Sequence, residues 1–262
     1  MNLNLKEKVI IVTGSGQGIG AAIAEALALE NAIPIVVSRS DTENQLVIEK
    51  IMAVGGMAYS VEAELTDPEE CKRAVGIVAE RYGRIDGLVN NAGVNDGVGL
   101  ENGSYEAFVD SLSCNIGHYY SMAHYALPYL KKTKGSILNI TSKIATTGQG
   151  GTSGYAAANG GRNALTREWA VELLKYGIRV NAIAVAECWT PMYENWINTK
   201  TNSDEILAEI KKNIPLGHRL TTCEEIANMA TFLMSSRSSH TTGQIMYVDG
   251  GYVHLDRAIL KK

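Results

Sequence analysis

Residues 9–20 read VIIVTGSGQGIG, a run of β-branched residues that leads directly into a glycine-rich turn. The run Val9–Thr13 is typical of a strand that is buried on both faces, as strands of a parallel sheet are. Residues Ala21–Glu30 predict a helix, and Pro34–Ser38 predict a second buried strand. A strand, a turn, a helix and a strand within about 30 residues make a βαβ unit, so this stretch predicts a parallel sheet.

The same alternation continues along the chain. The pattern predicts further helices at 42–53, 68–82, 105–130 and 155–176, and further strands at 58–62, 87–90, 136–141, 178–183 and 245–248. About seven parallel strands that alternate with helices predict one doubly wound sheet, an α/β Rossmann fold with helices on both faces.

The organisation of the chain follows from this alternation. No repeat or low-complexity linker appears, so residues 1–262 are interpreted as one domain whose cofactor half ends near residue 140. The least regular stretch, 185–214, follows the sixth strand. Loops at the carboxyl ends of strands carry the sites of such sheets, so this stretch is interpreted as a substrate lid.

The composition argues against several classes of function. The net charge of −4 gives no electrostatic reason to expect nucleic acid or an anionic membrane as partner. The four cysteines are scattered and have no metal-ligand spacing, so we expect free thiols, no metal site and a reducing compartment. We find no signal peptide and no apolar run that could span a membrane, and we expect a cytoplasmic protein.

The glycine turn predicts a dinucleotide site. Residues Thr13–Gly20 follow the pattern T-G-x-x-x-G-x-G, in which glycines let the backbone approach a pyrophosphate at a helix N-terminus. Ser38-Arg39-Ser40 ends the second strand, where a carboxylate would select NAD. Arg39 can instead bind a 2′-phosphate, so NADP is favoured over NAD, although a solvated surface role for Arg39 stays open. Asn90-Asn91-Ala92-Gly93 ends the fourth strand and is expected to line the adenosine side.

Tyr155 and Asn159 form a second informative pattern. Residues four positions apart share one face of a helix. A cation at position 159 would stabilise the phenolate of Tyr155, because a free phenol ionises only near pH 10. Asparagine carries no charge and cannot do this.

Taken together, these motifs resemble the short-chain dehydrogenase/reductase family over essentially the whole chain. The matches are Thr13–Gly20, Asn90–Gly93, Asn115, Ser142, Tyr155, Asn181-Ala182, Thr190 and Asp249-Gly250-Gly251. The resemblance implies that Tyr155 is the general acid/base, that Ser142 holds the substrate oxygen, and that Asn115 holds a water that carries the proton onward.

In the family, a lysine stands where this chain has Asn159. That lysine favours the tyrosine phenolate and binds the nicotinamide ribose, and Asn159 is expected to serve only the second role. A phenolate that forms about three pH units higher costs about 4 kcal/mol near pH 7, on the order of a thousandfold in rate. Lys143 follows Ser142, but neighbours on a strand face opposite sides, so we do not expect it to replace the cation. We therefore expect an impaired enzyme, either through an inactivating substitution or as a naturally silenced relative.

The resemblance also assigns cofactor contacts. Cys188 and Thr190 match positions that hold the nicotinamide carboxamide. The predicted cofactor-binding residues are Gly14, Ser15, Gln17, Gly18, Ile19, Ser38, Arg39, Ser40, Glu64, Leu65, Asn91, Ala92, Gly93, Tyr155, Asn159, Cys188 and Thr190.

The segment Ala186–Trp196 and the tail Asp249–Arg257 are similar to the L-fucose dehydrogenase branch of the family. This similarity implies oxidation of an aldose at C1 to a lactone. The predicted substrate residues are Gln149, Glu187, Trp189, Tyr193 and Trp196, with His118 as a further polar candidate. A carboxylate suits sugar hydroxyls and an indole suits an apolar sugar face.

Other interpretations stay open. Glu187 can be a solvated loop carboxylate, Trp196 a lid-packing residue and His118 a helix-core histidine. A 3-oxoacyl or other ketone reductase of the same family is the alternative enzyme, and a non-catalytic dinucleotide-binding protein is the alternative class. The resemblance further implies a homotetramer built through the helices that contain Asn115 and Tyr155.

Overall fold

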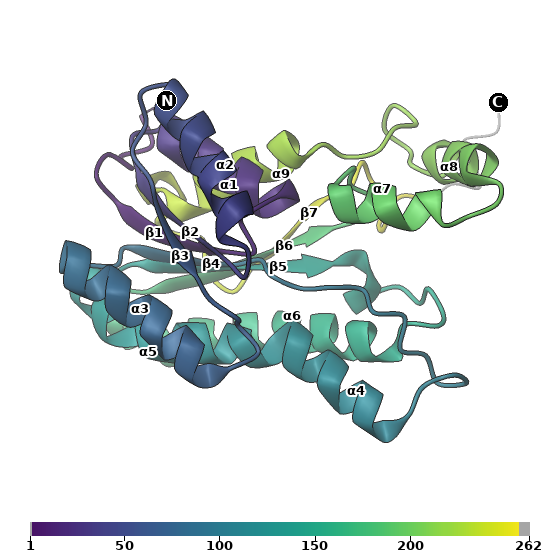
Figure 1. The fold of residues 1–262 in the computed structure, drawn as a ribbon, viewed down its shortest axis with the longest axis horizontal. Helices are drawn as coiled ribbons and strands as arrows, with labels where there is room; N and C mark the ends of the chain where they lie inside the picture. Colours follow the sequence, from purple (N-terminus) through teal and green to yellow (C-terminus); the bar gives the residue numbers. More distant parts are fainter. Residues whose placement is uncertain (1, 257–262) are drawn as a thin grey trace.

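A single parallel sheet organises the computed structural model, which describes residues 2–256 (Figure 1). Its seven strands lie in the order β3-β2-β1-β4-β5-β6-β7. They are β1 (Val9–Thr13), β2 (Ile33–Ser38), β3 (Tyr59–Glu62), β4 (Gly87–Asn90), β5 (Ser136–Ser142), β6 (Arg179–Val185) and β7 (Ile245–Val248). Every pair of neighbouring strands is parallel, which confirms the predicted doubly wound sheet. Arg257 of the quoted tail lies outside the described residues.

Helices cover both faces of this sheet (Figure 1). One face carries α1 (Gly18–Leu29), α2 (Asp41–Ala53) and α9 (Cys223–Met234), and the other carries α3 (Pro68–Tyr82), α4 (Tyr105–Leu112), α5 (His118–Thr133) and α6 (Ser153–Leu173). Two further helices, α7 (Pro191–Asn198) and α8 (Ser203–Lys212), follow the carboxyl end of β6. No helix within residues 2–256 is both long and apolar enough to cross a membrane.

The two faces of β1 show why its sequence is continuously apolar. Val9 and Ile11 belong to the core under α3, α5 and α6, whereas Ile10 and Val12 belong to the core under α1 and α9. Alternate side chains of a strand point to opposite faces, and here both faces are covered. The buried-strand interpretation of Val9–Thr13 is therefore confirmed.

The predicted helix 105–130 is wrong in one respect, because a π-helical turn interrupts it. Residues Ser113–Gly117 form this turn between α4 and α5. A π turn shifts main-chain hydrogen bonds by one residue and leaves a carbonyl without its α-helical partner. The side-chain amide of Asn115 donates to the main-chain oxygen of Ser111 at 3.0 Å and satisfies that carbonyl. Hydrophobic periodicity does not reveal such a local exchange.

The expectation that residues 185–214 lack regular secondary structure is also wrong. Residues 185–214 contain α7 and α8 rather than irregular chain. Thr190 caps α7 by accepting from the amide of Tyr193 at 3.1 Å, and Pro191 occupies the first turn. Helix α9 was not predicted, although its capping box of Thr222 and Glu225 is visible in the sequence.

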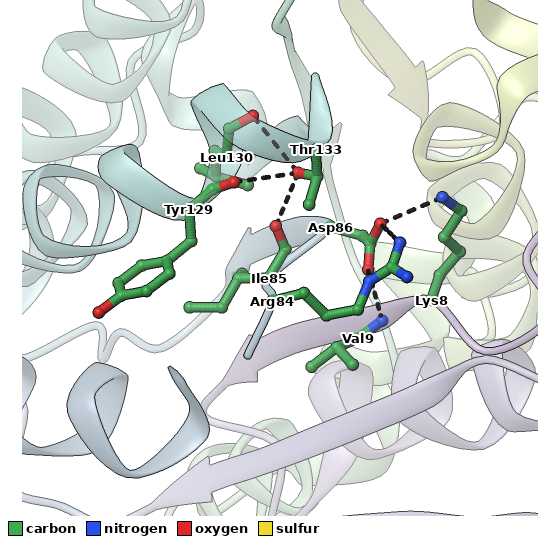
Figure 2. A network of polar contacts seen from close by, with 8 residues as sticks. All are labelled: Lys8, Val9, Arg84, Ile85, Asp86, Tyr129, Leu130 and Thr133. Carbon is green, nitrogen blue, oxygen red and sulfur yellow. Dashed lines mark hydrogen bonds and ion pairs between the residues drawn. The ribbon is translucent and has the colours of Figure 1, made fainter. Parts of the chain in front are cut away.

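A buried carboxylate joins β1 to the start of β4 at the amino edge of the sheet (Figure 2). Asp86 accepts from Arg84 Nη2 at 2.6 Å, from Lys8 Nζ at 3.1 Å and from the amide of Val9 at 3.1 Å. Burial raises the pKa of Asp86, but the hydrogen bonds from Arg84, Val9 and Lys8 outweigh it and hold the pKa below its ordinary value. This edge lies opposite the carboxyl ends of the strands, where the candidate site forms.

Candidate active site

Close packing shapes the glycine turn between β1 and α1. Gly14 and Gly18 have φ of +62° and +60°. A Cβ on Gly14 would lie 2.7 Å from Cα of Ala92, and one on Gly20 would lie 2.4 Å from the oxygen of Gly14. The side-chain amide of Asn91 donates to the oxygens of Thr13 and Gly14 at 2.9 and 3.1 Å. The turn is therefore held tightly against the end of β4.

The start of α1 fits an anionic group such as a pyrophosphate. Its N-cap residue, Gln17, makes no side-chain capping bond, and its first turn contains no acidic residue. In contrast, α2 and α3 have side-chain caps and acidic first turns. Uncapped amides at a helix N-terminus attract negative charge. The predicted residues Gly18 and Ile19 lie in this first turn.

Other predicted cofactor residues have protein partners. The hydroxyl of Ser15 is fully buried, donates to the oxygen of Val12 at 2.6 Å and accepts from the amide of Val37 at 3.0 Å. It joins β1 to β2, and the main-chain amide of Ser15 adds a long contact to the oxygen of Val37 at 3.4 Å. The hydroxyl of Ser38 donates to Oδ1 of Asn44 at 2.7 Å, and Ser40 caps α2.

Arg39 is exposed beside a depression of about 670 Å³. Glu64 lines the same depression, whereas Leu65 is buried. No ion pair within the described residues involves Arg39, so its guanidinium is available to a phosphate.

The four predicted catalytic residues come from three elements. Ser142 ends β5, Asn115 lies in the π turn, and Tyr155 and Asn159 lie in the first two turns of α6. Ser142 is 9% exposed and accepts from the amide of Ile144 at a long 3.4 Å. Tyr155 is half-buried.

Asn159 is fully buried and bonded to the protein itself. Its Nδ2 donates to the main-chain oxygen of Tyr155 at 2.8 Å. Its Oδ1 accepts from the hydroxyl of Thr141 at 3.4 Å and from Nη1 of Arg162 at 3.1 Å. The amide therefore links the tyrosine helix to β5 and to a cation.

Arg162 is the residue that our interpretation of the sequence missed. It is 3% exposed, and its Nε donates to the main-chain oxygen of Asn115 at 2.7 Å. The spacing of Tyr155, Asn159 and Arg162 is i, i+4 and i+7, which places all three on one face of a helix. That spacing is the signal that could have identified it.

Asn115 is likewise fully buried. Its Oδ1 accepts from the amide of Val94 at 2.8 Å and from Nη2 of Arg162 at 3.4 Å. The structure thus connects Asn115 to Asn159 through a single guanidinium.

His118 lies one turn from Arg162's partner Asn115 but faces the core. Its side chain is 3% exposed, and Nε2 lies 3.1 Å from the main-chain oxygen of Cys114. Burial, and then the charge of Arg162, lower the pKa of His118 to about 3. The structure supports the helix-core interpretation of this residue.

Lys143 and Glu187 form a mostly buried ion pair. Their side chains are 10% and 15% exposed, and the ammonium lies 4.1 Å from the ring centre of Tyr252. Lys143 is thus engaged with Glu187, in keeping with the prediction that it does not replace the missing lysine. Glu187 is not a solvated loop carboxylate.

Aromatic side chains form a row along α7. Ring centres of Trp189 and Tyr193 are 6.1 Å apart, and those of Tyr193 and Trp196 are 5.3 Å apart. Both indoles are about two-fifths exposed, at 41% and 42%. Burial, and then Glu187, raise the pKa of Tyr193 far above its ordinary value. Gln149 is exposed in the loop before α6.

The base of the lid contacts the glycine turn. Cys188 is buried 3.8 Å from the sulfur of Cys223, and all four cysteines are free. A Cβ on Gly18 would lie 3.5 Å from Cβ of Thr190. The structure therefore brings the predicted nicotinamide and pyrophosphate residues together. Within residues 2–256, no group of three or more potential ligands is placed to hold a metal ion.

Comparisons with known proteins agree with this geometry. Residues 14–253 match the family model described as enoyl-(acyl carrier protein) reductase. The chain is 33% identical over 252 residues to the 3-oxoacyl-[acyl-carrier-protein] reductase FabG of Thermotoga maritima, which covers 96% of this chain and 100% of that protein. The chain belongs to the short-chain dehydrogenase/reductase family.

Other short-chain dehydrogenase/reductase relatives extend this picture. The L-fucose dehydrogenase of Bos taurus is 32% identical over 93% of this chain and 88% of its own length. The crystal structure of Cj0485 dehydrogenase is 48% identical, has a TM-score of 0.93 and covers 99% of both chains. The relatives are NAD(P)-dependent oxidoreductases of this family. Both a ketoacyl reductase and a sugar dehydrogenase are therefore among them.

Proposed function

We propose that this chain is an NADP-preferring dehydrogenase that oxidises an aldose such as L-fucose at C1 to the lactone. The observation that carries the proposal is the Lys143–Glu187 pair beside the aromatic row of α7. Fixed polar groups next to exposed indoles suit a ligand with hydroxyls on one side and C–H groups on the other. An apolar fatty-acyl chain would form no hydrogen bonds with a buried ion pair.

The proposed reaction assigns a role to three of the four predicted catalytic residues. Bound NADP would supply the hydride acceptor for C1, and Cys188 and Thr190 are the residues predicted to hold its nicotinamide. As the C1–H bond breaks, the phenolate of Tyr155 takes the proton of the C1 hydroxyl, and a C1=O bond forms. Ser142 would donate to that oxygen, and Asn115 would hold the water that carries the proton onward. The sugar is oxidised by two electrons and the cofactor is reduced.

A substrate panel tests the proposal. L-fucose, other aldoses and 3-oxoacyl thioesters are assayed at equal concentrations with NADP and with NAD, in the matching direction. Turnover of an aldose at least tenfold above that of any thioester supports a sugar dehydrogenase. The opposite ranking favours the 3-oxoacyl reductase, for which the full-length similarity to FabG is the supporting observation.

The non-catalytic alternative has its own supporting observation, since Asn159 supplies no charge and its amide is bonded to the main chain of Tyr155. Cofactor affinity measured beside turnover separates it from an enzyme. Tight NADPH binding without turnover of any substrate, in the wild type and in Asn159→Lys, would favour a binding protein. The expected impairment predicts instead that Asn159→Lys alone raises turnover by orders of magnitude.

The remaining predictions stay part of the proposal. They are a single domain with its cofactor half near residues 1–140, a lid at 185–214, the cofactor contacts given above, a homotetramer built through α4, α5 and α6, and a cytoplasmic location. Sedimentation analysis tests the tetramer, and limited proteolysis with and without NADPH tests the lid.

A further inference from the structure

Two of the four free cysteines, Cys188 and Cys223, are in contact with each other. Their Sγ atoms are 3.8 Å apart, although 35 positions separate the residues in the sequence. Both thiols also approach the main-chain oxygen of Trp189, Cys223 at 3.4 Å and Cys188 at 4.0 Å. No other two cysteines within residues 2–256 share a hydrogen bond.

The two sulfurs are close enough to be joined by a small movement. The sulfur atoms of a disulfide are about 2.05 Å apart, so these two must approach each other by roughly 2 Å. Main-chain hydrogen bonds hold their segments side by side, since the amide of Thr221 donates to the oxygen of Glu187 at 2.9 Å and the amide of Trp189 donates to the oxygen of Thr221 at 3.3 Å. This bridge keeps the thiols near each other in the reduced protein.

The two thiols differ in access and in acidity. Cys223 is half-buried at the first residue of α9, whereas Cys188 is only 4% exposed. A hydrogen bond from the Cys188 thiol lowers the pKa of Cys223, against the opposing effects of burial and of Glu224. The same hydrogen bond, and then burial, raise the pKa of Cys188 far above its ordinary value. Since the thiolate is the form that an oxidant attacks, Cys223 is the first thiol to react.

A bond between the two sulfurs would disturb the base of the lid. The start of α9 is fixed by the capping box of Thr222 and Glu225, so the movement falls on the segment that contains Cys188. Oxidation also removes both S–H groups that approach the oxygen of Trp189. The next residue, Thr190, caps α7 and lies beside Gly18 of the glycine turn. A disulfide therefore changes the segment that is predicted to hold the nicotinamide.

We propose that Cys188 and Cys223 form a reversible redox-modification site, at which a peroxide oxidises Cys223 and Cys188 then closes a disulfide that weakens cofactor binding. Formation of the disulfide depends only on the two thiols, whereas its effect rests on the proposed role of Cys188 and Thr190 in holding the nicotinamide. Disulfides that form in a reducing compartment, the one expected for this chain, are usually transient and redox-sensing.

The two steps balance with peroxide as the oxidant. In the first step the sulfur of Cys223 attacks one oxygen of hydrogen peroxide, the O–O bond breaks, and a sulfenic acid and one water form. In the second step the sulfur of Cys188 attacks that of Cys223, the S–O bond breaks, and the hydroxyl leaves with the proton of Cys188 as a second water. The two thiols lose two electrons, and the peroxide gains them. A dithiol such as dithiothreitol returns both cysteines to thiols and is itself oxidised.

The disulfide is tested first, without substrate or cofactor. The folded protein is treated with a small excess of hydrogen peroxide, its remaining thiols are alkylated after unfolding, and its peptides are mapped by mass spectrometry. We expect a peptide pair joined through Cys188 and Cys223 that disappears after dithiothreitol. Absence of this pair, or equal joining of Cys223 to Cys71 or Cys114, would overturn the proposal.

Three single variants test the order of the steps. In Cys188→Ala the sulfenic acid of Cys223 has no thiol to attack it, so dimedone should label Cys223. In Cys223→Ser dimedone should leave the buried Cys188 unlabelled. Cys114→Ser is the matched control, because Cys114 is half-buried like Cys223 but has no sulfur partner among the described residues, and it should form the disulfide as the wild type does. Labelling of Cys188 in a folded Cys223→Ser would contradict the proposed order.

Cofactor affinity then tests the effect of the disulfide. NADPH is titrated by fluorescence into reduced, oxidised and re-reduced protein. Oxidation should weaken binding by about tenfold, the loss expected when one hydrogen bond is broken, and dithiothreitol should restore it. The affinity of Cys223→Ser should not respond to peroxide, whereas that of Cys114→Ser should fall as in the wild type. Equal affinity of the reduced and oxidised wild type would overturn the regulatory effect.

These two readouts separate this inference from the proposed function. If the reduced protein binds no NADPH, the proposed function fails, and a disulfide between Cys188 and Cys223 would still support the modification site. If the reduced protein binds NADPH and peroxide forms no disulfide, the proposed function stands and the modification site is overturned.

Discussion

Gly93 and Arg162 are packed so closely that a Cβ atom on Gly93 would lie 2.7 Å from Nη2 of the arginine and 2.9 Å from Oδ1 of Asn115. The Asn-Asn-Ala-Gly motif after β4 therefore has a structural role in addition to its proposed role in cofactor binding. It leaves room for the buried guanidinium. This contact connects the cofactor side of the sheet to the catalytic side.

Gly93→Ala should therefore disturb both stability and turnover. Overpacking at a buried polar contact is expected to lower the free energy of unfolding by about 1 to 3 kcal/mol. Urea denaturation measures this loss, and NADPH production measures the displacement of Arg162. Gly76→Ala is the matched control, because Gly76 is exposed in α3 with nothing within 4 Å of its Cβ position. Equal stability of Gly93→Ala and the wild type would contradict the packing argument.

His118 should make the protein less stable in acid. Its pKa is about 3 in the folded chain against an ordinary 6.5, so the unfolded chain binds the proton first. The free energy of unfolding should therefore fall as the pH drops from about 6.5 toward 3, by up to about 1.4 kcal/mol per unit. In His118→Gln this slope should flatten, whereas the exposed His124→Gln should keep it. Parallel slopes in all three proteins, measured by chemical denaturation at each pH, would exclude the effect.

The ion pair of Lys143 and Glu187 should respond to single and double substitution differently. Glu187→Gln leaves a mostly buried ammonium unpaired and should cost about 3 kcal/mol of unfolding free energy. Lys143→Met/Glu187→Gln removes both charges and should recover much of that loss. The exposed pair of Lys72 and Glu69 is the control, and Glu69→Gln should cost under about 0.5 kcal/mol. A double variant no more stable than Glu187→Gln alone would contradict this expectation.

Arg39 should decide the preference between NADP and NAD. A charge-assisted hydrogen bond contributes about 1.5 to 3 kcal/mol, so Arg39→Gln should weaken NADPH binding by about 10- to 100-fold. NADH binding should change little. Fluorescence titration of both nucleotides gives the two dissociation constants. If both affinities fall equally, Arg39 does not read the 2′-phosphate.

Periodicity and turn chemistry predict the sheet because they are local. The predicted boundaries are correct for Val9–Thr13, Pro68–Tyr82 and Gly87–Asn90. Buried apolar runs and helix caps each depend on residues that are consecutive in the sequence. The lid helices α7 and α8 were missed although Thr190 and Pro191 give a start signal for the first of them.

The motifs predict which residues form the proposed catalytic set, but they do not predict the contacts between those residues. The order and spacing of Asn115, Ser142 and Tyr155 identify the family. The bonds that join Asn115 to Asn159 run through Arg162, and they depend on a π turn and a helix from different parts of the chain. Likewise, the partner of Lys143 lies 44 residues away on another strand end. Such contacts form only once the sheet has brought the carboxyl ends of its strands together.

The π turn at Ser113–Gly117 also sets the phase of the helix before it. Each residue of an α-helix turns the chain by about 100°, so deleting one residue of the turn would swing α4 around its own axis by that amount. Ser111 would then no longer pack against Gly154. The packing there is tight, because a Cβ atom on Gly154 would lie only 2.4 Å from the hydroxyl oxygen of Ser111. Gly154 lies in the first turn of α6, the helix that contains Tyr155. The extra residue of the π turn therefore fixes the rotation of α4 about its own axis, and deleting one residue there would change that rotation.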